Sequence, residues 1–82
     1  MDKALRELQD LAEVISIAIA REKASIALYN DAYLKAISED AKRVFSLLIE
    51  QERAHEASLR EQLAEVSAEI ELKRSRREGT KE

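Results

Sequence analysis

Three side chains in two distant stretches of the chain carry the donor atoms of a metal site. Glu52 and His55 lie three residues apart in 48-LIEQERAHEASL-59, and His55 is the only histidine of the chain. On a helix, residues at i and i+3 are neighbours on one face, so a carboxylate and an imidazole would point the same way. Glu22, thirty residues before Glu52, supplies a second carboxylate. Oxygen and nitrogen donors suit iron or manganese, and a chain without cysteine offers no thiolate.

Two long amphipathic helices are predicted to position these donors. The chain has no proline, and its only glycine, Gly79, lies near the end, as is typical of long helices or a coiled coil. In both halves, apolar residues recur at alternating spacings of three and four, which indicates a heptad seam. The first seam comprises Leu5, Leu8, Ala12, Ile15, Ile19, Glu22, Ile26, Tyr29 and Tyr33. The second comprises Phe45, Leu48, Glu52, His55, Leu59, Gln62 and Val66.

A tight turn is predicted at residues 36–38, between the two seams. Ser38 is a good N-cap for the second helix, because Glu39 and Asp40 follow in the first turn, where the helix dipole favours acids. Asp2 is the corresponding cap of the first helix. We therefore expect one domain, residues 1–78, with helices over about 3–36 and 39–77, followed by a tail of residues 79–82.

The short connection predicts which residues meet across the hairpin. Two helices joined by a short turn are antiparallel, so residues at one level have numbers that sum to about 74. Glu22 then meets Glu52, and His55 lies in the same layer opposite Ile19. Two carboxylates in a buried layer are unfavourable unless one is protonated, paired with a cation or bound to metal.

Simpler interpretations of each residue stay open. A lone histidine in a seam is often a satisfied core residue, and a seam glutamate often reaches water. Tyr29 and Tyr33 at helical spacing are typical of core packing, and Gln62 is typical of a polar residue that sets register. The combination of the three donors at one level nevertheless favours a metal site.

A single hairpin would leave such a site incomplete, because three ligands cover one side of a metal and half of the apolar surface stays bare. Two hairpins related by a two-fold axis through this layer would form a four-helix bundle with four glutamates and two histidines. Their charge of about −4 is neutralised by two divalent cations. The expected fold is therefore all-α, a two-helix antiparallel hairpin that dimerises into a four-helix bundle. It would hold two iron ions per dimer, or manganese or zinc in their place.

The stretches 18-AIAREKASIALY-29 and 47-LLIEQERAHEASLREQL-63 resemble half of a ferritin-like, rubrerythrin-like bundle. The chain is most similar to encapsulated ferritins and half-ferritins, in which one chain has two long helices and a dimer rebuilds the di-iron bundle. The resemblance covers residues 5–70. It rests on the interval from Glu22 to Glu52, on His55 three residues later, and on Tyr29 seven residues after Glu22.

This resemblance implies a ferroxidase that oxidises Fe(II) to Fe(III) with oxygen, in iron storage or detoxification. Glu22, Glu52 and His55 of both chains would be the metal ligands and catalytic residues, and Tyr29 would lie behind them. The implied partner is a second copy of the chain, as a homodimer or a larger homo-oligomer such as a ring. Iron and oxygen would be the substrates.

The chain departs from this family in three places. Encapsulated ferritins carry carboxylates beside the first ligand for iron loading, where this chain has Arg21 and Ala24. They also end in a peptide with apolar residues that docks in an encapsulin shell, whereas no apolar residue follows Leu72 here, so docking in a shell through this tail is not expected. Rubrerythrins add a cysteine-based iron domain, so peroxide reduction by that route is not expected in a chain without cysteine.

Two other functions fit the same residues. One is a metal-free antiparallel coiled-coil dimerisation module, in which the polar layer fixes register. The other is a bundle that binds zinc or manganese without turnover. The ligand set does not separate the second from a ferroxidase, because carboxylate and imidazole accept several metals.

Charge and composition favour a soluble chain without nucleic-acid or membrane partners. The net charge is −3, and residues 73–82 hold five basic and two acidic residues. Cations at the end of a helix complement its dipole, which is a simpler reading of this tail than nucleic-acid binding. The chain has no apolar run of membrane-span length and no signal-peptide pattern at its start, so we expect a cytoplasmic protein.

Overall fold

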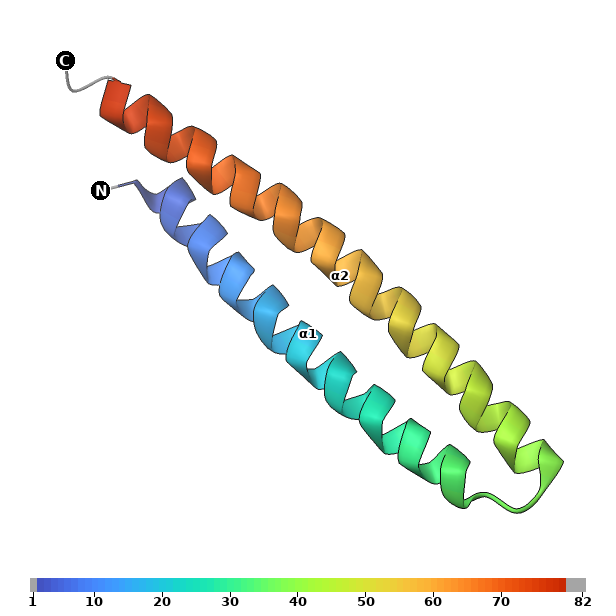
Figure 1. The fold of residues 1–82 in the computed structure, drawn as a ribbon. Helices are drawn as coiled ribbons and strands as arrows, with labels where there is room; N and C mark the ends of the chain where they lie inside the picture. Colours follow the sequence, from blue (N-terminus) through green and yellow to red (C-terminus); the bar gives the residue numbers. More distant parts are fainter. Residues whose placement is uncertain (1, 80–82) are drawn as a thin grey trace.

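The protein is a long hairpin of two antiparallel helices, as expected from its sequence (Figure 1). The computed structural model describes residues 2–79, with side chains as far as residue 76. Helix α1 spans Lys3–Lys35, and helix α2 spans Glu39–Gly79. The molecule measures 67 × 15 × 13 Å, and the first turn of α1 and the last turn of α2 lie at the same end of the hairpin. Of the predicted tail, residues 80–82 lie outside the described part.

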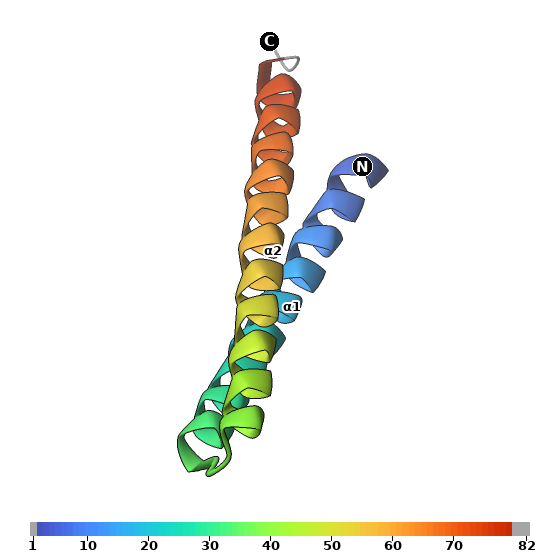
Figure 2. The ribbon, with the colours of Figure 1, turned by 90° about the vertical axis from the view of Figure 1, so that its right-hand side faces the viewer.

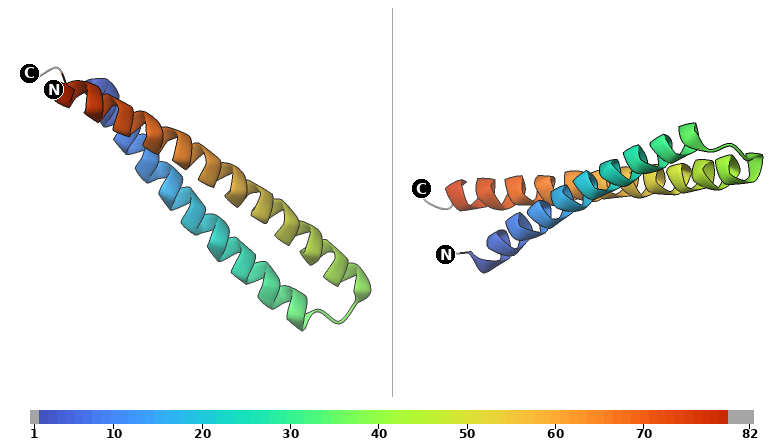
Figure 3. Two further views of the ribbon diagram at one scale, coloured as in Figure 1. Left: turned by 45° about the horizontal axis from the view of Figure 1, so that its top comes forward. Right: turned by 90° about the horizontal axis from the view of Figure 1, so that it is seen from below.

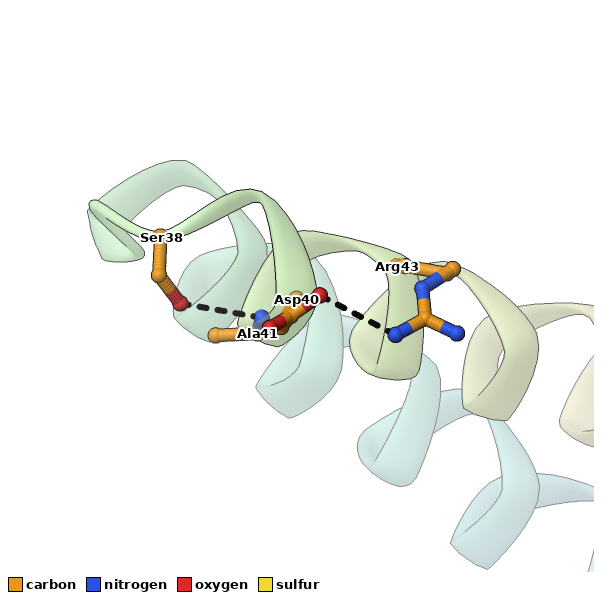
Figure 4. A network of polar contacts seen from close by, with 4 residues as sticks. All are labelled: Ser38, Asp40, Ala41 and Arg43. Carbon is orange, nitrogen blue, oxygen red and sulfur yellow. Dashed lines mark hydrogen bonds and ion pairs between the residues drawn. The ribbon is translucent and has the colours of Figure 1, made fainter.

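Both predicted N-caps and the predicted turn are confirmed. Asp2 Oδ1 accepts a hydrogen bond of 3.1 Å from the Leu5 amide at the start of α1. Ser38 Oγ accepts one of 3.0 Å from the Ala41 amide at the start of α2 (Figure 4). Helix α1 ends because Ala36 takes an extended conformation, with φ −67° and ψ 139°. These caps satisfy amides that have no partner within their own helix.

The seam of α1 agrees with the prediction over most of its length. Leu5, Ile15 and Ile19 are buried against α2, and Glu22 and Tyr29 are half-buried. Tyr33, which was expected at the end of this seam, is exposed near the turn. The sequence therefore predicts the buried face of α1 except in its last turn.

The predicted seam of α2 is wrong at His55 and Gln62, which are exposed, whereas its other members are half-buried. The neighbours Glu56 and Leu63 are half-buried in their place, and Ile49 and Ile70 are buried. The row that faces α1 is thus displaced by one residue at these levels. The reason is apolar area, because Ile49, Leu63 and Ile70 bury more hydrocarbon than Leu48, Gln62 and Glu69 would. The shift moves His55 to the edge of the seam.

The two helices cross obliquely rather than running exactly side by side (Figures 2 and 3). Their contact buries only a narrow apolar strip, and large hydrophobic side chains on both helices remain exposed. No helix within residues 2–79 combines the length and the hydropathy that crossing a membrane requires.

Candidate metal centre

The three predicted ligands converge in the middle of the hairpin. Glu22 projects from α1, and Glu52 and His55 project from neighbouring turns of α2. One donor atom from each of the three lies within 4.8 Å of the others. Their meeting confirms the predicted level of Glu22 and Glu52, and it follows from the length of the turn. That these residues bind a metal is still a prediction.

The spacing of the donors is suitable for a metal ion. His55 Nδ1 lies 3.9 Å from Glu22 Oε1 and 3.9 Å from Glu52 Oε1. Both separations are too long for hydrogen bonds. Ligands bound to one ion at about 2.0–2.2 Å lie roughly 3–4 Å apart, so these atoms can share an ion with small rotations of their side chains.

The electrostatics of Glu22 are unfavourable without a cation. The carboxyl of Glu52 raises the pKa of Glu22 above its ordinary value, first by hydrogen bonding to it and further by like-charge repulsion. Partial burial and the charge of Glu56 raise the same pKa, and His55 lowers it. Oxygen Oε2 of Glu22 is buried and accepts no hydrogen bond. A divalent cation would complete this acceptor and remove the repulsion between the carboxylates.

Among the side chains that the structure describes, residues 2–76, no lysine or arginine pairs with Glu22 or Glu52. Within the described residues, the recorded ion pairs of Glu22 and Glu52 are those with His55. The sequence neighbours Arg21 and Arg53 are exposed and form no recorded pair with either acid. The donor set of two carboxylate oxygens and one imidazole nitrogen therefore fits iron, manganese or zinc.

The group is open on one side of the hairpin. The side chains of Glu22 and Glu52 are 21% and 19% exposed, whereas that of His55 is 67% exposed. The two helices thus cover the carboxylates, and the imidazole marks the uncovered edge. Tyr29 is half-buried two turns along α1 from Glu22, and its role beside the ligands stays a prediction.

The sequence reading missed Glu56, which lies in the seam one turn beyond Glu52. Its side chain is 20% exposed, and its Oε2 accepts a hydrogen bond of 2.8 Å from Nε of Arg60 and lies 2.7 Å from Nη2 in the same ion pair. The row of Ile49, Leu63 and Ile70 is the signal that would have placed Glu56 on this face.

Comparison with known proteins adds a family to this geometry. Residues 2–63 match the sequence model of the rubrerythrin family, whose description reads "Rubrerythrin". No curated protein and no solved structure matches the chain. The match runs from the N-cap of α1 past His55, so it covers more than half of the chain and all three candidate ligands. The chain therefore belongs to the rubrerythrin family, within the ferritin-like superfamily of di-iron helical proteins.

Proposed function

We propose that two copies of this chain form a four-helix bundle of the half-ferritin type, related to encapsulated ferritins, and oxidise Fe(II) with oxygen at a shared di-iron site. The observation that carries the proposal is the convergence of Glu22, Glu52 and His55 without a lysine or arginine partner among the described residues. Ferritin-like di-iron bundles use a glutamate from each of two helices and a Glu-x-x-His pair from each of the other two. A dimer of this hairpin contains that set.

The partner is a second copy because the open edge of the metal group lies on an apolar face. In an antiparallel pair, the residues one place before each seam position face the same side of the hairpin. Glu56 is a seam residue, so His55 belongs to this face. The face also carries Leu11, Val14, Ala18 and Leu28 of α1 and Val44 and Leu48 of α2. A second hairpin packed on this face would cover these side chains and bring three more ligands to the centre.

Each residue has a defined task in this mechanism. Glu22, Glu52 and His55 of both chains would hold two Fe(II) as substrate. The two ions would lose one electron each, and one O2 would take up both electrons with two protons from solvent to give hydrogen peroxide. Glu22 and Glu52 provide negative charge that stabilises the more positive oxidised ions. His55 would add a nitrogen donor to each ion from the uncovered edge of the site. Ile19 and Ile49, both buried in the seam, limit the access of water to the carboxylates from within the hairpin. The product Fe(III) would serve iron storage or detoxification.

Replacing Glu22 and Glu52 together by leucine separates this function from a metal-free scaffold. If the protein oxidises iron, the wild type consumes Fe(II) in air faster than buffer, and the double variant matches the buffer. If the polar layer only sets register, the wild type also matches the buffer and the variant unfolds at a higher temperature. The matched control makes the same change at Glu50 and Glu61, which are exposed on α2.

Zinc or manganese binding without turnover is the third outcome. The wild type would then retain the metal after gel filtration, and the double variant would not. Both proteins would oxidise Fe(II) at the rate of the buffer. Counting bound metal per chain beside each rate separates this outcome from the other two.

A further inference from the structure

A third carboxylate, that of Glu56, lies next to Glu22 and Glu52 but is held by an arginine. Glu56 follows Glu52 by four residues on α2, so both project into the gap between the helices. The side chains of Glu56, Glu52 and Glu22 are equally buried, at 20%, 19% and 21% exposed. Glu56 is also close enough to raise the pKa of Glu22 by like-charge repulsion. It is nevertheless absent from the group of donors that lie within 4.8 Å of one another.

The contact that occupies Glu56 differs from the arginine pairs Arg43–Asp40 and Arg74–Glu71. Arg60 donates a hydrogen bond of 2.8 Å from Nε to Glu56 Oε2, and its Nη2 forms an ion-pair contact of 2.7 Å with the same oxygen. The pairs Arg43–Asp40 and Arg74–Glu71 have single contacts of 3.1 and 3.3 Å between exposed side chains. A short contact from two N–H groups to a partly buried carboxylate is stronger than such surface pairs.

The positions of His55 and Arg60 on either side of the seam show in which direction Arg60 draws the carboxylate of Glu56. His55 lies on the open apolar face, and Glu56 and Arg60 follow it towards the opposite side of α2. Arg60 therefore draws the Glu56 carboxylate away from His55. Without Arg60, a charged Glu56 would face Glu22 and Glu52 with no cation of its own, and a metal ion would become its best partner.

We propose that Arg60 is a positioning residue of the metal centre, which holds Glu56 away from the metal and so keeps the set at Glu22, Glu52 and His55. This inference rests on the metal site of the proposed function. Fewer carboxylates leave coordination positions open for oxygen and lower the affinity for oxidised iron, so that iron can leave. An added carboxylate would fill a position and hold the ion more tightly.

Binding of cobalt(II) tests this proposal without any turnover. Its visible absorption weakens as the coordination number rises, so the spectrum reports how many ligands the ion has. The wild type, Arg60→Gln, Arg60→Lys and the double variant Glu56→Gln/Arg60→Gln are titrated with Co(II) under identical conditions. Arg43→Gln is the matched control, because it removes an arginine–carboxylate pair far from the centre. Arg60 is half-exposed, and circular dichroism checks that each variant keeps its helices.

The expected result is specific to Glu56. Arg60→Gln binds Co(II) about tenfold more tightly than the wild type, and its absorbance per cobalt falls. Arg60→Lys keeps a cation beside Glu56 and stays near the wild type. The double variant returns to the wild-type affinity and spectrum, because the freed carboxylate is gone. Arg43→Gln changes nothing.

Two results overturn the proposal in distinguishable ways. If the wild type binds Co(II) and Arg60→Gln has the same affinity and spectrum, the metal site stands and Arg60 has no part in it. If the wild type binds no Co(II), the metal site of the proposed function fails and the role of Arg60 fails with it.

Discussion

Glu22 of α1 and Glu52 of α2 bring their carboxyl groups together in the middle of the hairpin, where Glu52 raises the pKa of Glu22. A contact between two acids in a partly buried layer costs stability unless a proton or a cation lies between them. The protein is therefore arranged so that protonation or metal binding relieves the same repulsion. Several of the predictions below follow from that relationship.

The metal-free protein should lose stability as the pH rises past the ordinary range of a glutamate. A group whose pKa is higher in the folded state stabilises the fold below its unfolded pKa, and this contribution is lost as pH rises through the folded pKa. Glu22 is such a group, because Glu52 raises its pKa. The glutamine in Glu22→Gln is always neutral, so we expect the melting temperature of this variant to depend less on pH in this range. The melting temperatures are measured with a chelator present, so that no metal is bound. An unchanged slope in Glu22→Gln would contradict the assignment.

Metal should reverse this pH dependence in the wild type. Ligand carboxylates must be deprotonated to bind, so metal binding strengthens as the pH rises. Thermal unfolding with saturating Co(II) or Mn(II) should show stabilisation that grows from acidic to neutral pH and is small in Glu22→Gln. Equal stabilisation of both proteins at neutral pH would mean that the metal binds elsewhere.

The strip between the helices should carry the stability of the hairpin. Ile15 is 6% exposed, so Ile15→Ala should cost about 2 kcal/mol or more in the free energy of unfolding. Ile37 is 94% exposed, so Ile37→Ala should leave this free energy almost unchanged. Urea unfolding at one fixed protein concentration measures both, since the stability of an oligomer depends on concentration. Equal effects would place the core elsewhere.

The apolar face beside His55 should be the dimer interface. Leu28 is 64% exposed on this face, so Leu28→Glu would bury a charge on association and should give monomers in sedimentation. Ala27→Glu adds the same charge about 100° round the helix and should leave the assembly intact. Bound metal per chain should fall in Leu28→Glu alone. A monomeric wild type, or dimers in both variants, would rule out this interface.

The cap at the turn should contribute measurably to folding. Ser38→Ala removes the hydrogen bond to the Ala41 amide and should destabilise the fold by about 1 kcal/mol. Ser46→Ala, in the interior of α2, serves as the control and should be neutral or slightly stabilising, because alanine is the better helix former. Thermal unfolding of the pair, scanned at one concentration, measures the difference.

The sequence predicted the parts of this fold that local chemistry determines. Asp2 and Ser38 cap their helices by short-range hydrogen bonds, and the turn between them sets which residues meet. The contact of Glu22 with Glu52 follows from those two facts. This predicted contact does not depend on the exact phase of α2, because Glu52 belongs to both possible seams of that helix and faces Glu22 in each.

The phase of α2 was not predictable from spacing alone. Two rows of residues on α2 have alternating spacings of three and four, and they share Phe45, Glu52 and Leu59. One row continues through Leu48 and His55, and the other through Ile49 and Glu56. The choice between them depends on how much apolar area each row buries along the whole helix, including Ile70 beyond the predicted seam. As a result, spacing alone did not show that Glu56, the partner of Arg60, lies in the seam beside Glu52.

The most direct test of the central claim compares the wild type with His55→Ala in aerobic Fe(II) oxidation, with bound iron counted per chain. We expect about one iron per chain in the wild type, as two per dimer require, and oxidation faster than in buffer. His55→Ala should lose both, whereas Glu50→Ala, which changes an exposed residue on the other side of α2, should lose neither. If the wild type and His55→Ala oxidise iron at the same rate and hold the same amount, Glu22, Glu52 and His55 are not a di-iron centre.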